Sequence, residues 1–107
     1  MWGFRKKVFM KNILLVCSSG MSTNMLVQKM VKSAKLMNFD VNIWSVGDID
    51  VEENVDKADI ILLGPQVRYL FDKIKKIAGE NKTVLLIGLE DYSSMNSKNI
   101  LSQCFSN

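Results

Sequence analysis

The sequence predicts an α/β fold in which a parallel β-sheet is covered by helices on both faces, giving three layers, α/β/α. Four short apolar segments have the length and composition of strands, and segments with helical periodicity alternate with them. Turn-forming residues, glycine among them, follow the first, third and fourth apolar segments. Strands that alternate with helices form parallel sheets, and their crossover connections are right-handed.

The first strand and helix are predicted between residues 12 and 38. Residues 12–16 are apolar and partly β-branched, which is typical of a buried parallel strand. A helix should run from Ser22, which suits the N-cap, to about Asn38, which suits the C-terminal turn. Its apolar face and the opposite lysine face follow from helical spacing: Leu26, Val27, Met30, Val31, Ala34 and Met37 against Lys29, Lys32 and Lys35.

The middle of the chain predicts two more strands, Val41–Val46 and Asp59–Leu63. The acidic segment 48–57 between them should form one or two helical turns. Pro65 suits the first turn of a third helix, and Gly79 suits its end. The apolar face of that helix comprises Val67, Leu70, Phe71, Ile74, Ile77 and Ala78.

The last predicted strand is Thr83–Ile87, which Gly88 ends, and a weaker helical pattern runs from about Ser93 to Cys104. In such parallel sheets, ligands bind beyond the carboxyl ends of the strands. Cys17 lies at that end of the first predicted strand.

Composition and charge exclude several classes of protein. The chain has 107 residues, enough for one domain, with 48% hydrophobic and 23% charged residues. The net charge is +3, but three of the 14 basic residues precede Met10, which leaves 11 basic against 11 acidic residues. A neutral body lacks the basic face that nucleic-acid binding requires. We therefore expect no nucleic-acid partner.

The apolar segments are also too short for a membrane protein. The fully apolar runs, such as residues 84–87, are far shorter than a bilayer span. The first residues lack the long apolar region of a secretory signal. We expect a cytoplasmic protein without direct membrane insertion.

The cysteine and histidine content limits the available chemistry. Cys17 and Cys104 are too few for a disulfide scaffold. The chain has no histidine, which removes a usual zinc ligand and excludes Ser-His-Asp and Cys-His catalysis within it. We expect no metal and no cofactor.

The segment Cys17-Ser18-Ser19-Gly20-Met21-Ser22-Thr23 joins the first strand to the first helix. Unpaired backbone N–H groups at a helix start favour an anion, and Gly20 lets the loop curl around a phosphate-sized group. Four hydroxyl side chains add donors. The same field should lower the pKa of Cys17 and favour its thiolate, the form that attacks phosphorus.

A purely structural reading remains open at this point, because cysteine is among the commonest core residues and the loop could be a simple turn. The order of strand, cysteine, glycine loop and helix start favours the chemical reading. Cys104 lies on the apolar face of the last helix without such a loop, and we interpret it as part of the core.

The sequence resembles the lactose/cellobiose (chitobiose) type of enzyme IIB from the phosphoenolpyruvate-dependent sugar phosphotransferase system (PTS). The resemblance runs from about Lys11 to Leu101. It rests on residues 13–23, followed by 25–27, 29 and 30, on residues 58–67 with Tyr69, and on Tyr92, Met95, Asn96, Ile100 and Leu101. The family usually has an acidic residue and glycines in the third stretch, so Asn96 and Ser97 depart from its pattern.

The resemblance implies a four-stranded parallel sheet of order 2-1-3-4 and a phosphocysteine at Cys17. It implies that the donor is a phosphohistidine on a IIA partner and the acceptor a sugar delivered through the membrane component IIC. The missing histidine would then belong to the partner. The family beginning matches Met10, so residues 10–107 form the expected IIB domain. Residues 1–9 would be vector-derived sequence or a wrongly assigned start.

The partner surface is expected around Cys17–Thr23 and Gly64–Tyr69, because both segments leave the carboxyl edge of the sheet. Within them, Met21, Gln66 and Tyr69 are the candidate docking residues. Met21 stands in the loop, and Tyr69 lies off the apolar face of its helix. Exposed methionine and tyrosine side chains are typical of contact surfaces.

Two other functions remain as alternatives. A cysteine-dependent phosphatase or an arsenate reductase shares the strand–loop–helix arrangement, but needs an arginine six positions after the cysteine to clamp the oxyanion. Thr23 occupies that position, so hydrolysis should be poor. The second alternative is a non-enzymatic regulatory module that uses the same fold.

Overall fold

The computed structural model describes residues 10–18 and 21–106, and no side chain of residues 21 and 22. Its four strands form one sheet in the order β2-β1-β3-β4, with every neighbouring pair parallel. This confirms the predicted order 2-1-3-4. The strands are β1 (Lys11–Val16), β2 (Val41–Val46), β3 (Ile60–Leu63) and β4 (Thr83–Leu86).

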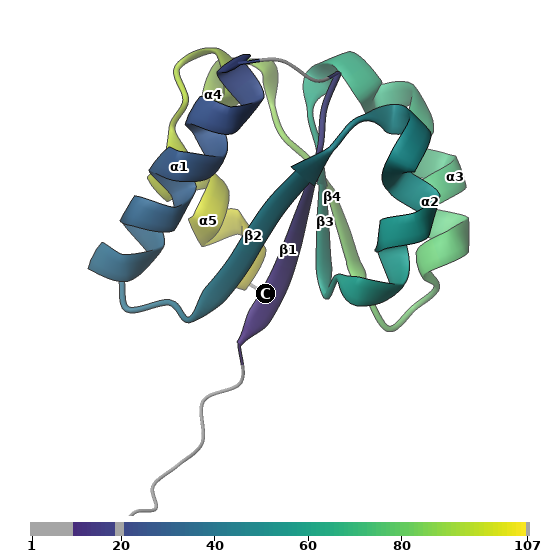
Figure 1. The fold of residues 1–107 in the computed structure, drawn as a ribbon, viewed down its shortest axis with the longest axis horizontal. Coiled ribbons are helices and arrows are strands. Elements are labelled where there is room, and N and C mark those ends of the chain that lie inside the picture. Colours follow the sequence, from purple (N-terminus) through teal and green to yellow (C-terminus); the bar gives the residue numbers. More distant parts are fainter. Residues whose placement is uncertain (1–9, 19–20, 107) are drawn as a thin grey trace, which may run out of the picture.

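Helices cover both faces of this sheet (Figure 1), as predicted. On one side lie α1 (Met21–Leu36), α4 (Leu89–Ser93) and α5 (Ser97–Phe105), and on the other α2 (Val51–Asn54) and α3 (Phe71–Ala78). Three short 3-10 turns complete the connections: η1 (Asp48–Asp50), η2 (Val55–Lys57) and η3 (Pro65–Leu70).

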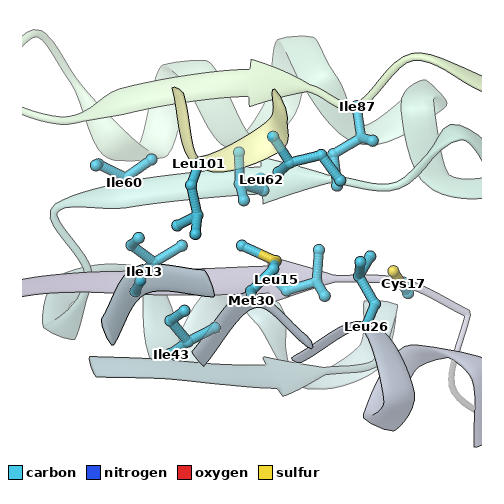
Figure 2. Packing of buried hydrophobic residues seen from close by; sticks show 12 residues of the cluster. Ile13, Leu15, Cys17, Leu26, Met30, Ile43, Ile60, Leu62, Ile87 and Leu101 are labelled. Atoms are coloured by element: carbon cyan, nitrogen blue, oxygen red, sulfur yellow. The ribbon is translucent and has the colours of Figure 1, made fainter. Parts of the chain in front are cut away.

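The buried side chains form two clusters, one on each face of the sheet. Successive strand residues point to opposite faces, so Ile13 and Leu15 pack under α1 and α5 while Leu14 and Val16 pack under α2 and α3. Figure 2 shows the first cluster, in which Leu26 and Met30 of α1 meet β1. Cys17 continues the alternation of Ile13 and Leu15, and its side chain therefore belongs to the α1 face.

The helix predicted from Pro65 to Gly79 is divided in the structure. Residues 65–70 form the 3-10 turn η3, in which Val67 has a non-helical conformation (φ −117°, ψ 25°), and α3 begins only at Phe71. Gly79 ends α3 with φ 75°, as expected for a glycine after a helix. The predicted apolar face was wrong at one residue, because Ile77 is 43% exposed.

The last predicted helix, from about Ser93 to Cys104, is two helices. α4 begins earlier, at Leu89, and α5 begins at Ser97 after a turn in which Met95 has φ 52°. The Asn96 side chain caps α5 by accepting a hydrogen bond from the Asn99 N–H at 3.2 Å. The prediction missed the break because residues 93–99 contain a single apolar residue, Met95, and so show no period by which a break could be located.

The first helix differs from its prediction at its start and at one residue of its buried face. α1 begins at Met21, so Ser22 lies within the helix and is not its N-cap. Met21 likewise begins α1 and does not lie in the preceding loop. Asn38 follows the helix with φ 62°, a conformation that asparagine tolerates, as predicted. Val31, predicted on the buried face, is 37% exposed.

Candidate functional site around Cys17

Cys17 follows β1 directly and sits at the carboxyl edge of the sheet. Its backbone N–H donates to the Val46 carbonyl of β2 at 3.2 Å, which continues the β1–β2 pairing by one residue. Its side chain is 0% exposed and lies at the end of the first cluster, beside Leu26 (Figure 2). β1 is a central strand, so the sulfur is surrounded by elements on all sides.

Three elements bring hydrogen-bonding groups to the Cys17 sulfur. Thr23 contributes its hydroxyl from the first turn of α1 and is only 4% exposed. Tyr92 contributes its phenol hydroxyl from α4. The third group is the backbone amide of Gly64, at the end of β3. The Gly64 amide also donates to the Val16 carbonyl at 2.8 Å, so it is shared between two acceptors.

Gly64 is needed for this close arrangement. A Cβ atom at this position would lie 2.9 Å from the Cys17 Sγ and 3.1 Å from the Gln66 Oε1. The backbone of Gly64 is extended (φ −66°, ψ 160°), a conformation open to any residue. The glycine is therefore required by the space beside the sulfur and not by its backbone angles.

The described surroundings raise the pKa of the Cys17 thiol, which corrects the expectation of a lowered value. Burial is the largest cause, because a thiolate loses its hydration there, and hydrogen bonds from Thr23, Tyr92 and Gly64 oppose it. Burial alone acts on Cys104 and raises its pKa to about 12. Cys17 should therefore still ionise at lower pH than Cys104, as the sequence predicted.

Tyr92 is coupled to the same cluster. Burial is the main reason that the pKa of its phenol is raised, and the Cys17 thiolate adds to the rise. Hydrogen bonds from Thr23 and Gln66 act in the opposite direction, because they stabilise the phenolate. The side chains of Cys17, Thr23, Gln66 and Tyr92 thus form one group at the sulfur, which we call the thiol cluster.

The structure places only some of the predicted loop. Ser18 is exposed next to Cys17, whereas Ser19 and Gly20 lie outside the described residues. Met21 and Ser22 belong to the first turn of α1, but their side chains are not described. Thr23 is the one predicted loop residue whose side chain is seen to reach the sulfur.

The predicted docking residues differ from one another in the structure. Tyr69 is 67% exposed, and its hydroxyl donates to the Asp48 Oδ2 at 3.0 Å. Gln66 is also exposed, yet its side chain contacts Tyr92 in the thiol cluster. The structure does not describe the Met21 side chain, so the prediction that Met21 takes part in docking stays a prediction.

Sequence reasoning missed the roles of Gly64 and Tyr92. The Gly64-Pro65 turn after the third apolar strand was a usable signal, because neighbouring parallel strands end at the same edge. The signal for Tyr92 was weaker, because the sequence indicated it only as one of the residues near the C-terminus that carry the family resemblance. No periodicity predicts that a tyrosine in a five-residue helix will reach the end of another strand.

A small cavity lies at the same carboxyl edge. Its volume is about 260 Å³, and its lining combines Arg68 with apolar groups: Pro65, Leu86, Ile87, Gly88 and Leu89. Leu86 and Leu89 are 40% and 69% exposed, although they are large apolar side chains. Among the described residues, no helix is long and apolar enough to cross a membrane.

Comparisons with known proteins agree with this geometry. A curated relative, the PTS oligo-beta-mannoside-specific EIIB component of Bacillus subtilis, is 40% identical over 98 residues, covering 91% of this chain and 95% of the relative. The cellobiose-specific EIIB component of Lactococcus lactis is 35% identical and covers 86% of this chain and 91% of the relative.

Solved structures give the same result. The cellobiose-specific IIB component of Borrelia burgdorferi is 37% identical, with a TM-score of 0.70, covering 88% of this chain and 87% of that one. The lactose-specific IIB domain of Streptococcus pneumoniae, at 16% identity and a TM-score of 0.79, shares the fold over 92% of this chain and 100% of that one. Residues 12–103 match the family described as "PTS system, Lactose/Cellobiose specific IIB subunit". The chain therefore belongs to the lactose/cellobiose family of PTS IIB components, which are phosphotransferases.

Proposed function

We propose that Cys17 carries the phosphoryl group in this IIB component. The observation that carries the proposal is its position: the sulfur lies between the end of β1 and the start of α1, facing two hydroxyl donors. The first turn of a long helix favours a bound anion, because its N–H groups have no partners within the helix. α1 has 16 residues and begins four residues after Cys17.

The transfer consists of two displacements at phosphorus. In the first, the Cys17 thiolate attacks a phosphohistidine on a IIA component, so that the N–P bond breaks and an S–P bond forms. In the second, a sugar hydroxyl presented by IIC attacks, the S–P bond breaks, and the hydroxyl proton is released as the thiolate leaves. Positioning and charge stabilisation are the main requirements of such transfers. We assign the acceptor to sugars of the cellobiose, lactose or chitobiose class.

The residue six positions after the cysteine supports a carrier over a hydrolase. Phosphatases and arsenate reductases of the cysteine type need an arginine there, and Thr23 fills this place. Thr23 is buried against the sulfur and has no charge with which to clamp an oxyanion. A carrier requires its phosphocysteine to survive in water, and the missing arginine suits that requirement.

The docking surface for both partners is assigned to the carboxyl edge of the sheet. It comprises Tyr69, Gln66, the exposed Leu86 and Leu89, and the cavity that contains Arg68. Met21 is kept in this proposal because it begins α1 beside the loop. We further assign the domain to residues 10–107, with residues 1–9 as an extension, and its location to the cytoplasm.

The proposal is tested by phosphorylating the protein with the complete relay and mapping the modification by mass spectrometry. We expect the phosphoryl group on Cys17. A Cys104→Ala variant should be labelled as fully as the wild type, and a Cys17→Ser variant should not be. Hydrolysis of p-nitrophenyl phosphate, measured in parallel, should stay at background. Wild-type labelling of Cys17→Ser would refute the carrier role, and rapid hydrolysis would support a phosphatase.

A further inference from the structure

We propose that Tyr92 is a positioning residue for phosphoryl transfer: its hydroxyl donates a hydrogen bond to the Cys17 sulfur, and the Gln66 amide holds that hydroxyl in place. The inference rests on the proposed carrier role of Cys17 and adds a residue to it. It explains why a thiol that is 0% exposed, among apolar side chains of the first cluster, remains usable as an anion.

The geometry supplies the contacts. Tyr92 packs from α4 against the same buried cluster as Cys17. The Cys17 Sγ and the Gln66 Oε1 lie 2.9 Å and 3.1 Å from one point, the position of a Cβ on Gly64, so these two side chains are neighbours. Cys17, Thr23 and Gln66 are also the groups whose side chains shift the pKa of Tyr92. Gln66 lies in the first turn of η3, and its amide oxygen lies beside Gly64, 3.1 Å from where a Cβ would be. A glutamine amide donates two hydrogen bonds, so it can hold the Tyr92 oxygen while the phenol hydrogen faces the sulfur.

The donors around the sulfur come from three elements and carry no formal charge. They are Thr23 from α1, Gly64 after β3 and Tyr92 from α4, and Tyr92 is the only titratable group among them. A hydrogen bond to an ionised group is stronger than one to a neutral group. The Tyr92 hydroxyl therefore stabilises the thiolate more than the thiol, and it acts whenever negative charge is on the sulfur.

This preference serves both halves of the transfer. The thiolate is the nucleophile when Cys17 accepts the phosphoryl group and the leaving group when Cys17 releases it. Stabilising the anion raises the thiolate fraction at neutral pH, although each thiolate is then somewhat less nucleophilic. It also makes the thiolate a better leaving group, so removal of the hydroxyl should slow the transfer to the sugar more than the uptake from IIA.

The first test follows the alkylation of Cys17 by iodoacetamide against pH in the full chain. Tyr92→Phe removes only the hydroxyl, and we expect the midpoint to move to higher pH by about one unit, so that alkylation at pH 7 slows by up to about tenfold. Tyr69→Phe is the matched control, because it removes the same atom from the exposed tyrosine that bonds to Asp48. Its alkylation curve should coincide with that of the wild type.

The second test measures how Cys17 affects the titration of the Tyr92 phenol. It does not require a folded Tyr92→Phe variant. The chain has two tyrosines, so Tyr69→Phe leaves the Tyr92 phenol as the only tyrosine seen in an ultraviolet titration. Adding Cys17→Ala to that background should lower the Tyr92 midpoint, because it removes the thiolate that opposes phenolate formation. The inference would be overturned if Cys17→Ala left the Tyr92 midpoint unchanged, or if Tyr92→Phe left the pH dependence of Cys17 alkylation unchanged.

These measurements need no phosphate relay, which separates this inference from the carrier role. If Cys17 carries no phosphoryl group but the two midpoints move as expected, the carrier role fails and the Tyr92–Cys17 contact stands. If Cys17 is phosphorylated and neither midpoint moves, the carrier role stands and the inference about Tyr92 fails. With both confirmed, Tyr92→Phe should reduce the rate of release to the sugar at a saturating acceptor concentration.

Discussion

Gly64 determines how much space the Cys17 sulfur has. The backbone around it is ordinary, with extended angles, and a Cβ would meet the sulfur at 2.9 Å, a distance that real Cβ atoms do not reach. The Cys17 side chain is buried and has Thr23 and Tyr92 among its neighbours. At this residue, the absence of a side chain is the structural feature that permits the thiol cluster.

Gly64→Ala should therefore destabilise the domain and disturb the thiol. Overpacking a tight core costs about 1–3 kcal/mol, and we expect a lower free energy of unfolding in urea together with an altered rate of Cys17 alkylation. Gly88→Ala is a closely matched control. Gly88 also caps a helix start with extended angles (φ −65°, ψ 151°), but a Cβ there meets nothing within 4 Å.

The control should change stability by less than about 1 kcal/mol, because Gly→Ala at an unstrained, open position alters mainly the unfolded chain and the cap. Equal losses in the two variants would show that the cost comes from the cap and not from the space beside the sulfur.

Cys104 provides a pH-dependent prediction. Burial raises its pKa from 9.0 to about 12 in the folded protein. Above pH 9 the thiol therefore loses its proton in the unfolded chain and keeps it in the folded one. Its contribution to the free energy of unfolding is fully present below pH 9 and is lost as the pH rises toward 12. By pH 10 the loss is about 1 kcal/mol.

The measurement compares unfolding free energies at pH 8 and pH 10 in the wild type and in Cys104→Ala. The variant loses packing at both pH values, and only the difference between the two pH values is used. That difference should be smaller in the variant by about 1 kcal/mol. A variant with the same pH dependence as the wild type would contradict a partly buried, neutral Cys104 thiol.

At the scale of helices, α1 and α5 are joined by a buried pair of hydroxyls. The Ser33 and Ser97 Oγ atoms lie 2.7 Å apart, and the two residues are only 7% and 5% exposed. Removing one hydroxyl leaves the other without this partner, which costs about 1–3 kcal/mol, whereas removing both is nearly neutral.

A double-mutant cycle tests this contact. Ser33→Ala and Ser97→Ala should each lower the free energy of unfolding, and the double variant should lose less than the sum of the two. Additive losses would instead mean that each hydroxyl is satisfied by a carbonyl of its own helix, as serine often is within helices.

The elements differ in how well the sequence predicts them. The four strands and α1 were predicted almost to their ends. β1, β3 and β4 contain continuous apolar runs, β2 alternates apolar and polar residues, and α1 is long enough to show its period. The break at Val67 and the turn at Met95 were not predicted. The break at Val67 interrupts a segment whose apolar residues keep a helical spacing, whereas Met95 lies among polar residues that show no period. In both places the tertiary packing decides where the helix stops.

At the scale of the whole molecule, the site is built by the sheet order. β1 is flanked by β2 and β3, and the carboxyl ends of β1 and β3 therefore bring Cys17 and Gly64 together (Figure 1). The sequence could predict this meeting once the order 2-1-3-4 was assumed. It could not predict the pKa of Cys17, because that depends on how completely the neighbouring elements exclude water from the sulfur.

Two exposed leucines lie near opposite edges of the sheet. Leu89 begins α4 at the carboxyl edge, one turn before Tyr92, and is 69% exposed. Leu36 ends α1 and is 74% exposed, but it lies near the opposite edge, where Lys11 of β1 pairs with the Asp40 carbonyl at 3.0 Å. The two residues have similar exposure, and only Leu89 is near Cys17.

Docking at the carboxyl edge predicts different results for these two positions. Leu89→Gln should raise the IIA concentration for half-maximal phosphoryl transfer by about tenfold, since a leucine side chain buried on docking contributes about 1.5–3 kcal/mol. Leu36→Gln, with a similar loss of exposed apolar area, should leave that concentration unchanged. Both variants should keep the melting temperature and the Cys17 alkylation rate of the wild type, because neither side chain is buried in the free protein. Equal effects of the two substitutions, or no effect of Leu89→Gln in a folded protein, would move the IIA contact away from α4.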